Sequence, residues 1–100
     1  MADRNGYEPS IVQHEMDHCF ICGTRYGNLD RHEIYGGANR EKSKRLGLWV
    51  MLCHHKCHLN GVHAHREMAD QLKQIGQVAA MNAYGWNTER FIEEIGRNYL

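Results

Sequence analysis

The sequence predicts a small α+β domain that a bound metal ion holds together. Two segments with strand-like patterns come first, at residues 29 to 36 and 46 to 53, and helical patterns follow them. Four cysteines lie in two close pairs around these segments. A chain of 100 residues with 42% apolar content can form one compact domain. Its core would supply little stability alone, so we expect the cysteines to bind a stabilising metal.

The two strand-like segments differ in their expected burial. LDRHEIYG, at 29 to 36, alternates apolar and polar residues as a half-buried strand does. LGLWVMLC, at 46 to 53, is almost continuously apolar and predicts a more buried strand. GANREKSKR lies between them and predicts a long, basic loop. The expected motif is therefore a β-hairpin with an extended connection.

Two helices are expected after the strands. The first, at about 64 to 84, has an apolar stripe predicted to lie in the core, made of Ala64, Met68, Leu72, Ile75 and Ala79. Gly85 is a suitable residue to end it. Asn87 or Thr88 can begin the second helix, at about 88 to 96, whose predicted buried residues are Phe91, Ile92 and Ile95.

The first sixteen residues form a polar leader in which we expect weak order, and residues 17 to 100 form one domain. No apolar run approaches the length of a membrane span, so no membrane association is expected. The leader does not resemble a secretion signal, which indicates a cytoplasmic protein with reduced thiols. The formal net charge is zero, so overall charge does not indicate a nucleic-acid partner.

The cysteine spacing predicts a structural zinc site. Cys19 and Cys22 form a C-x-x-C pair, and Cys53 and Cys57 form a C-x-x-x-C pair. Four thiolates about 2.3 Å from a zinc ion close its coordination sphere, which is typical of structural sites. The wider second pair leaves His54, His55 or His58 open as substitute ligands. Buried free thiols or a C-x-x-C redox site are the alternatives.

The segment LCHHKCHLNGVHAH, at 52 to 65, contains five of the eight histidines. If the cysteines hold zinc, His58 and His63 are available for a second divalent ion, and two imidazoles would leave positions open for substrate. His32 lies on the first predicted strand. A hairpin with the helix folded against it would bring His32 near the other two. With an ordinary pKa near 6.5, His32 could then act as a general base toward water.

The predicted loop has a local excess of positive charge, because Arg40, Lys42, Lys44 and Arg45 outnumber the single acid Glu41. Such a cluster could neutralise DNA phosphates. Asn39 begins this run and could be a ligand, a brace of the hairpin or a turn residue.

The stretch from about 19 to 65 contains, in order, C-x-x-C, a strand with a histidine, Gly-Gly, and L-C followed by C-H. The order of these motifs makes the stretch resemble the HNH (His-Me finger) endonucleases. These endonucleases have a zinc knuckle and a ββα-metal core. The longer match LDRHEIYGGANREKSKRLGLWVMLC, with GVH and FIEEIGRNYL, resembles small HNH proteins of bacteriophages and prophages. The resemblance implies a ββα-metal fold and metal-dependent hydrolysis of DNA. Products would be nicks with 5′-phosphate and 3′-hydroxyl ends, made in a bacterial host cell.

By the same resemblance, His32 corresponds to the first motif histidine and His58 to the last, a metal ligand; His63 is added by spacing. Two registers are open. In one, His32 is the base and Asp30 helps to hold the metal. In the other, His32 is a ligand and Glu33 is the base, provided that desolvation raises its pKa.

The family's central asparagine is missing before Cys53, where Gly47, Leu48 and Trp49 stand, so Asn39 is the candidate for its role. We add Arg31, beside His32, to the expected DNA-binding residues. The catalytic ion could be Mg²⁺, Mn²⁺, Ni²⁺ or Zn²⁺. A homodimer or a partner protein that supplies specificity is left open.

Two other functions are compatible with the sequence. One is a non-catalytic zinc-knuckle module that binds DNA or a protein through the basic loop, and that would not need His32 or His63. The other is a redox or zinc-storage protein, which would show reversible thiol oxidation and no affinity for nucleic acid.

Overall fold

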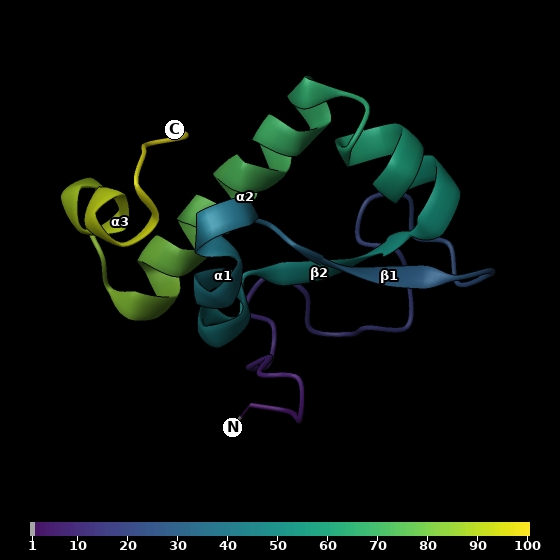
Figure 1. The fold of residues 1–100 in the computed structure, drawn as a ribbon, viewed down its shortest axis with the longest axis horizontal. Helices are drawn as coiled ribbons and strands as arrows, with labels where there is room; N and C mark the ends of the chain where they lie inside the picture. Colours follow the sequence, from purple (N-terminus) through teal and green to yellow (C-terminus); the bar gives the residue numbers. More distant parts are fainter. Residues whose placement is uncertain (1) are drawn as a thin grey trace.

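The computed structural model describes residues 2 to 100. A short sheet carries helices at both ends (Figure 1). In chain order, the elements are β1 (Leu29–Glu33), the 3-10 turn η1 (Gly37–Asn39), α1 (Arg40–Leu46), β2 (Trp49–Cys53), the π-helix η2 (His54–Val62), α2 (Arg66–Tyr84) and α3 (Thr88–Ile95). The α+β class predicted from the sequence is confirmed.

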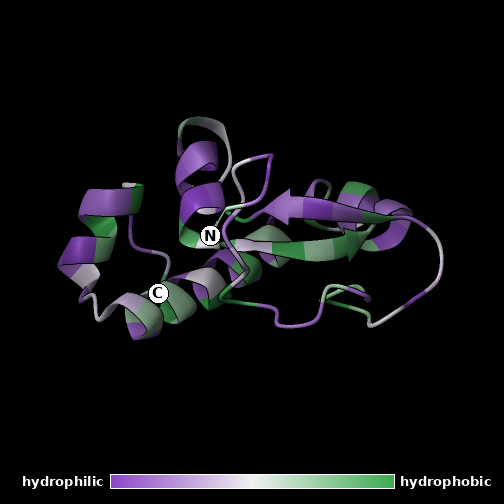
Figure 2. Ribbon diagram, turned by 90° about the horizontal axis from the view of Figure 1, so that it is seen from below, coloured by the Kyte–Doolittle hydropathy of each residue, from purple (hydrophilic) through white to green (hydrophobic). Residues whose placement is uncertain are grey.

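The two strands form an antiparallel pair in which Leu29 lies opposite Cys53 and Glu33 lies opposite Trp49. Both strands are shorter than the sequence predicts. The difference in burial is as expected, because β2 is mostly buried and β1 is half-buried throughout. Figure 2 shows the same contrast as a hydrophilic β1 beside a hydrophobic β2. The register brings Cys53 of β2 next to the loop that carries the first cysteine pair.

The prediction of a long basic loop is wrong, because most of this segment forms the helix α1. Its lysines and arginines are good helix formers. Glu41 lies in the first turn and Lys44 and Arg45 lie in the last turn, so these charges interact favourably with the helix dipole and stabilise α1. Gly47 ends the helix with a left-handed φ of 74°. Charge composition indicated a solvated loop, but the same residues suit a short capped helix.

The two C-terminal helices are confirmed, but their buried faces differ from the prediction. Ile75 was expected in the core and is 45% exposed, and Ile92 is also exposed. The face that α2 buries consists of Leu72, Gly76, Gln77 and Ala80. Along residues 2 to 100, no helix has both the length and the apolar character required to cross a membrane.

Gly76 explains the rotated face of α2. A Cβ atom at this position would lie 2.9 Å from the Tyr35 hydroxyl and 3.1 Å from an Ile34 methyl. The absence of a side chain thus lets α2 lie directly on the residues that follow β1. Tyr35 donates a hydrogen bond to the Lys73 carbonyl at 2.5 Å. These contacts fix α2 relative to the strand that carries His32.

The described residues of the leader make specific hydrogen bonds with the rest of the domain. The backbone N–H of Glu8 donates to the Lys44 carbonyl, and that of Ile11 donates to the Gly47 carbonyl, both at 2.9 Å. The buried Gln13 side chain accepts a hydrogen bond from the Met51 N–H at 2.8 Å. The leader therefore pairs its polar groups with α1 and β2, and a pattern of polar residues alone does not reveal such pairing.

Candidate metal centres

The four cysteines lie together where the N-terminal loop meets the end of β2. Their sulfur atoms are all within 4.8 Å of one another, and the Sγ atoms of Cys22 and Cys53 are 3.8 Å apart. Zinc–sulfur bonds of about 2.3 Å at tetrahedral angles imply sulfur separations near 3.8 Å. The cluster could therefore hold a zinc ion. The wider spacing of Cys53 and Cys57 needs no substitute histidine, because a π-helix begins between them.

The surroundings of Cys19 favour a thiolate. Burial opposes ionisation of this thiol, but backbone N–H groups near it, including that of Cys22 at 3.5 Å, lower its pKa to about 6. Burial raises the pKa of Cys57, and hydrogen bonds with the neighbouring thiols act in the same direction. A divalent cation bound at the cluster would favour the thiolate form of its ligands.

The π-helix η2 places His58 and His63 on the same side of the chain. An α-helix turns through about 140° beyond one full turn over five residues, whereas the wider π turn brings such residues nearly into line. The N–H of His63 donates to the carbonyl of His58 at 3.1 Å, which is the five-residue spacing of a π-helix. Their Nε2 atoms are consequently only 3.0 Å apart.

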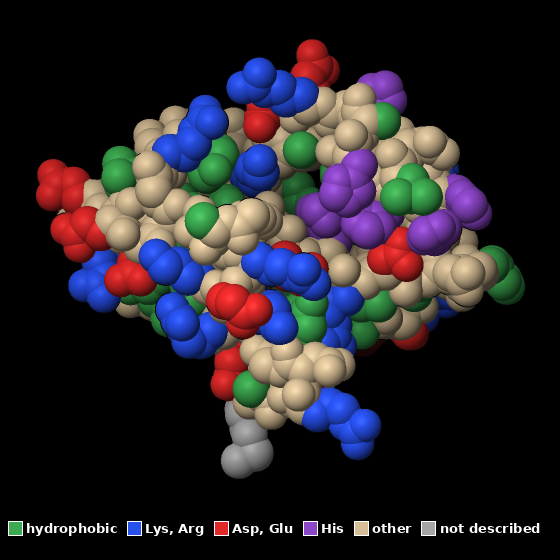
Figure 3. Space-filling model, in the orientation of Figure 1, with side chains coloured by type: hydrophobic (Ala, Val, Ile, Leu, Met, Phe, Trp, Pro, Cys, Tyr) green, Lys and Arg blue, Asp and Glu red, His purple; other side chains and the backbone are tan. Residues whose placement is uncertain are grey.

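β1 supplies the third member of this trihistidine cluster, His32. Its ring centroid lies 5.3 Å from that of His58 and 5.6 Å from that of His63. One nitrogen of each ring lies within 4.8 Å of the others. The sequence-based expectation that these three histidines converge is met. They line a cavity of about 510 Å³, and Figure 3 shows the histidines gathered beside a hollow in the surface.

Asp30 fixes the orientation of two imidazoles. Its Oδ2 atom lies 2.7 Å from Nδ1 of His58 and 2.6 Å from Nδ1 of His54. Burial raises the pKa of Asp30, but the two histidines outweigh this and the net pKa is lowered. A carboxylate bonded to Nδ1–H leaves Nε2 of His58 free to bind a metal. Asp30 thus lies behind His58 of the trihistidine cluster, and together with His54 and His58 it forms another group that could hold a metal ion.

His32 is held in its neutral form. Burial is the main cause, and His58 and His63 add to it, so that the pKa of His32 falls to about 4. At neutral pH the ring therefore has a free nitrogen lone pair that can accept a proton or bind a cation.

Glu33 does not meet the condition under which it could be the base. Burial raises the pKa of Glu33, but hydrogen bonds from Tyr7 and Arg40 outweigh that effect and lower it. The Tyr7 hydroxyl donates to Oε1 of Glu33 at 2.8 Å, and Nε of Arg40 donates to the same oxygen at 2.7 Å. The register that uses Glu33 as base needed a raised pKa, and this carboxylate has the reverse.

Asn39 acts as a brace. Its amide donates to the Ile95 carbonyl at 2.7 Å, which connects the start of α1 to the end of α3. It is not among the residues that line the trihistidine cavity. Of the three roles considered from the sequence, the structure gives Asn39 a bracing contact, although with α3 instead of within the hairpin.

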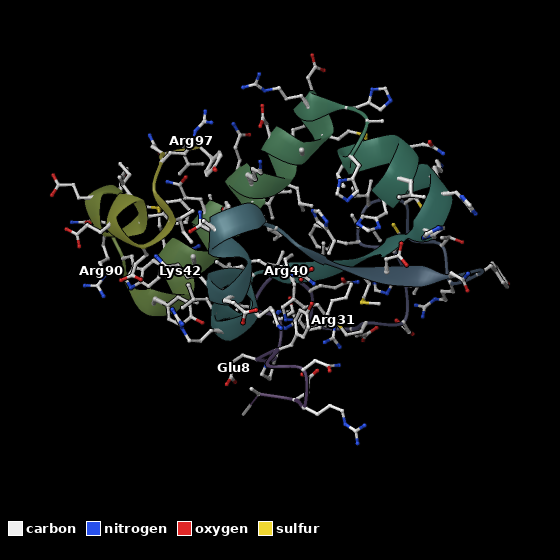
Figure 4. All side chains as sticks on the ribbon, viewed as in Figure 1. Glu8, Arg31, Arg40, Lys42, Arg90 and Arg97 are labelled. Carbon is white, nitrogen blue, oxygen red and sulfur yellow. The ribbon has the colours of Figure 1, made fainter. Side chains whose placement is uncertain are left out.

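Most of the expected DNA-binding cations already have partners within the chain. Arg31 stacks on the rings of Tyr7 and Trp49 at 4.1 and 4.4 Å and pairs with Asp3. Figure 4 shows Arg31 and Arg40 beside the hairpin, whereas Lys42 lies toward α3. Arg40 pairs with Glu33, and Lys42 donates a hydrogen bond to the Glu94 carbonyl. Lys44 contacts Glu41 and the Tyr7 ring, whereas Arg45 is exposed.

Two of the predicted cations, Arg31 and Arg40, line the trihistidine cavity, and a third cation there was missed. Lys73 of α2 reaches it, and the positive charge of Lys73 contributes to the lowered pKa of His32. No local pattern distinguishes Lys73 from other lysines on a polar helix face. Only the packing of α2 on β1 brings this residue to the cavity.

In comparisons with protein-family models, curated proteins and solved structures, nothing matched the chain.

Proposed function

We propose that this protein is a metal-dependent endonuclease of the HNH type that hydrolyses DNA phosphodiester bonds. The observation that carries the proposal is the trihistidine cluster, His32, His58 and His63, in an open cavity edged by Arg40 and Lys73. Both acids nearest to the cluster, Asp30 and Glu33, are already hydrogen-bonded. The cavity thus combines metal-binding nitrogens with positive charge, which suits a phosphodiester substrate.

The donor set fits a divalent ion held mainly by His58 and His63. Their Nε2 atoms are 3.0 Å apart, and Asp30 holds the His58 ring in the required tautomer. A bound ion would supply Lewis-acid stabilisation of the charge that develops on the phosphate and leaving oxygen. Mg²⁺, Mn²⁺, Ni²⁺ and Zn²⁺ all remain candidates.

The remaining steps belong to side chains of this chain. His32 stands edge-on to the other two rings and is neutral at pH 7, so its free nitrogen can take a proton from the attacking water, although its lowered pKa makes it a weaker base than an ordinary histidine. Arg40, whose side chain is 65% exposed, and Lys73 can attract and orient the phosphate. These assignments favour the register in which His32 is the base.

The four cysteines have a separate role in this proposal, as ligands of a structural zinc. Four thiolates complete the coordination of the ion and leave no position for substrate. Zinc binding of this kind supplies about 10 kcal/mol or more of folding free energy, comparable to the whole stability of a small domain. The zinc would hold the N-terminal loop to the end of β2, next to the start of η2.

Nicking of supercoiled plasmid tests the proposal. The purified zinc-loaded protein is incubated with Mg²⁺, Mn²⁺ or Ni²⁺ in turn, beside His32→Ala, His63→Ala and a matched control, His14→Ala, whose side chain is exposed and outside the cavity. We expect metal-dependent nicking by the wild type and the control. Both cavity variants should lose at least about 100-fold in rate, because each removes a participant in the chemistry.

Zinc content and circular dichroism must be unchanged in the variants for the comparison to hold. If no ion supports nicking by the wild-type protein, the enzymatic proposal fails. Salt-sensitive DNA binding without nicking would then indicate the non-catalytic binding module.

A further inference from the structure

A second cavity adjoins the trihistidine cavity on the side of the cysteine cluster. It has a volume of about 600 Å³, a size common for small-molecule sites. The lining residues that matter here are Thr24, Tyr26, Asn28, His54, His55 and Lys56. None of its lining residues, all of them within the described range 2 to 100, is acidic. The cavity therefore offers hydrogen-bonding groups and the positive charge of Lys56, and Cys22 and Cys53 of the cysteine cluster form another part of its lining.

The two cavities share a wall. His54 lines the second cavity and His58 lines the first, and both imidazoles bond to the same oxygen of Asp30. The interacting atoms of these three residues lie within 4.8 Å of one another. A nucleotide in the second cavity would be a close neighbour of a phosphate at the trihistidine cluster. One strand could therefore occupy both sites.

Tyr26 stands at the rim of the second cavity with its ring in solvent. It is 87% exposed, the most exposed of the large hydrophobic residues described. Its backbone N–H donates to the Thr24 hydroxyl at 3.3 Å, which helps to form the turn before β1. The ring itself takes no part in the core. An exposed aromatic ring beside a lysine is an arrangement that can stack on an unpaired base while the lysine binds its phosphate.

We propose that the second cavity binds a nucleotide of single-stranded DNA, whose base stacks on Tyr26 and whose phosphate is held by Lys56 and His55. Bases in a duplex are already stacked and paired, so this contact requires a single-stranded segment. The inference rests on the proposed nuclease function for its position beside the scissile phosphate. It adds a class of substrate: DNA that is single-stranded next to the cleavage site.

Fluorescence anisotropy tests the site. The probes are a labelled 12-nucleotide oligothymidine and a labelled blunt-ended DNA duplex, and the protein is zinc-loaded with no other divalent ion added. The variants are Tyr26→Ala and its matched control Tyr26→Phe, which keeps the ring. We expect Tyr26→Ala to bind the oligothymidine about tenfold more weakly and Tyr26→Phe to bind it as the wild type does. Binding of the duplex should change less.

Equal affinity of Tyr26→Ala and Tyr26→Phe for the oligothymidine would overturn the inference, as would an absence of single-strand binding by the wild type. The plasmid nicking assay on the same preparations separates the two proposals. Nicking without any Tyr26 effect overturns only the single-strand site. Tyr26-dependent binding without nicking overturns the nuclease and supports the single-strand site.

Discussion

The cysteine cluster and the trihistidine cluster are both candidate metal centres, but they are built differently. The cysteines come as two local pairs, mostly buried, one in the loop before β1 and the other at the end of β2 and in η2. The histidines come from β1, η2 and the turn after η2, and they face an open cavity edged by cations. A closed set of thiolates suits a structural ion, whereas an open set of imidazoles suits chemistry. The comparison predicts that the trihistidine cluster can be disrupted without loss of the cysteine-bound zinc. Disruption of the cysteine cluster, in contrast, should also abolish the trihistidine cluster.

The largest effect should follow Cys57→Ser. Loss of one thiolate weakens a site that would supply about 10 kcal/mol or more, so the variant should be largely unfolded and zinc-poor. Far-UV circular dichroism and elemental analysis measure this. The matched control is His55→Ala, an exposed neighbour in η2, which should keep both zinc and fold. A folded, zinc-free Cys57→Ser protein would show that the cysteines are not the staple.

The next effect concerns pH and separates the histidines from the cysteines. The pKa of His32 is about 4 in the fold against an ordinary value of 6.5, so the unfolded chain binds this proton more readily. The contribution of neutral His32 to the free energy of unfolding is therefore complete above pH 6.5 and is lost as the pH falls toward 4. The loss is on the order of 2 to 3 kcal/mol.

Urea unfolding of the wild type and His32→Gln at several pH values, without added divalent ions other than the structural zinc, measures this contribution. Protonation of the thiolates affects both proteins alike, so the difference between them isolates His32. A difference in unfolding free energy that does not vary between pH 6.5 and 4 would contradict the burial of a neutral ring.

A smaller effect should follow Asp30→Asn. The amide cannot hold the His58 and His54 rings as a carboxylate does, so affinity for the histidine-bound ion should fall about 10- to 100-fold. Calorimetric titration with Ni²⁺ measures the affinity, and zinc content should not change. An unchanged Ni²⁺ affinity would mean that Asp30 does not orient the ligands.

The smallest effect in this series concerns the edge of the open centre. Lys73→Ala should reduce nicking about tenfold, because one cation near the phosphate is removed. Lys42→Ala is the matched control, since Lys42 bonds to the Glu94 carbonyl and does not line the cavity. Initial nicking rates at fixed ionic strength provide the test. Equal rates for the two variants would place the phosphate elsewhere.

The two centres also differ in how far the sequence predicted them. The cysteine cluster follows from spacing alone, because C-x-x-C and C-x-x-x-C are local patterns and a hairpin joins them. The convergence of His32 with His58 and His63 could be predicted once a hairpin was assumed. The π-helix could not, although it aligns His58 with His63, since no residue pattern in HHKCHLNGV distinguishes it from an α-helix.

The remaining errors arose where tertiary contacts override local patterns. Ile75 fits the apolar stripe of α2, yet the close packing of Gly76 on Tyr35 turns the helix and exposes it. Glu33 could be a base by sequence, but Tyr7 of the leader and Arg40 of α1 lower its pKa. Lys73 reaches the cavity only through the packing of α2. Each of these depends on residues far apart in the chain.

The most direct test of the account is the metal content of each centre. Zinc-loaded wild type and His63→Ala are dialysed to equilibrium against micromolar Ni²⁺, and zinc and nickel per chain are measured by elemental analysis. Two independent centres predict one zinc and one nickel in the wild type, and zinc alone in the variant. Equal nickel binding by both proteins, or loss of zinc together with nickel in His63→Ala, would contradict two separate metal centres.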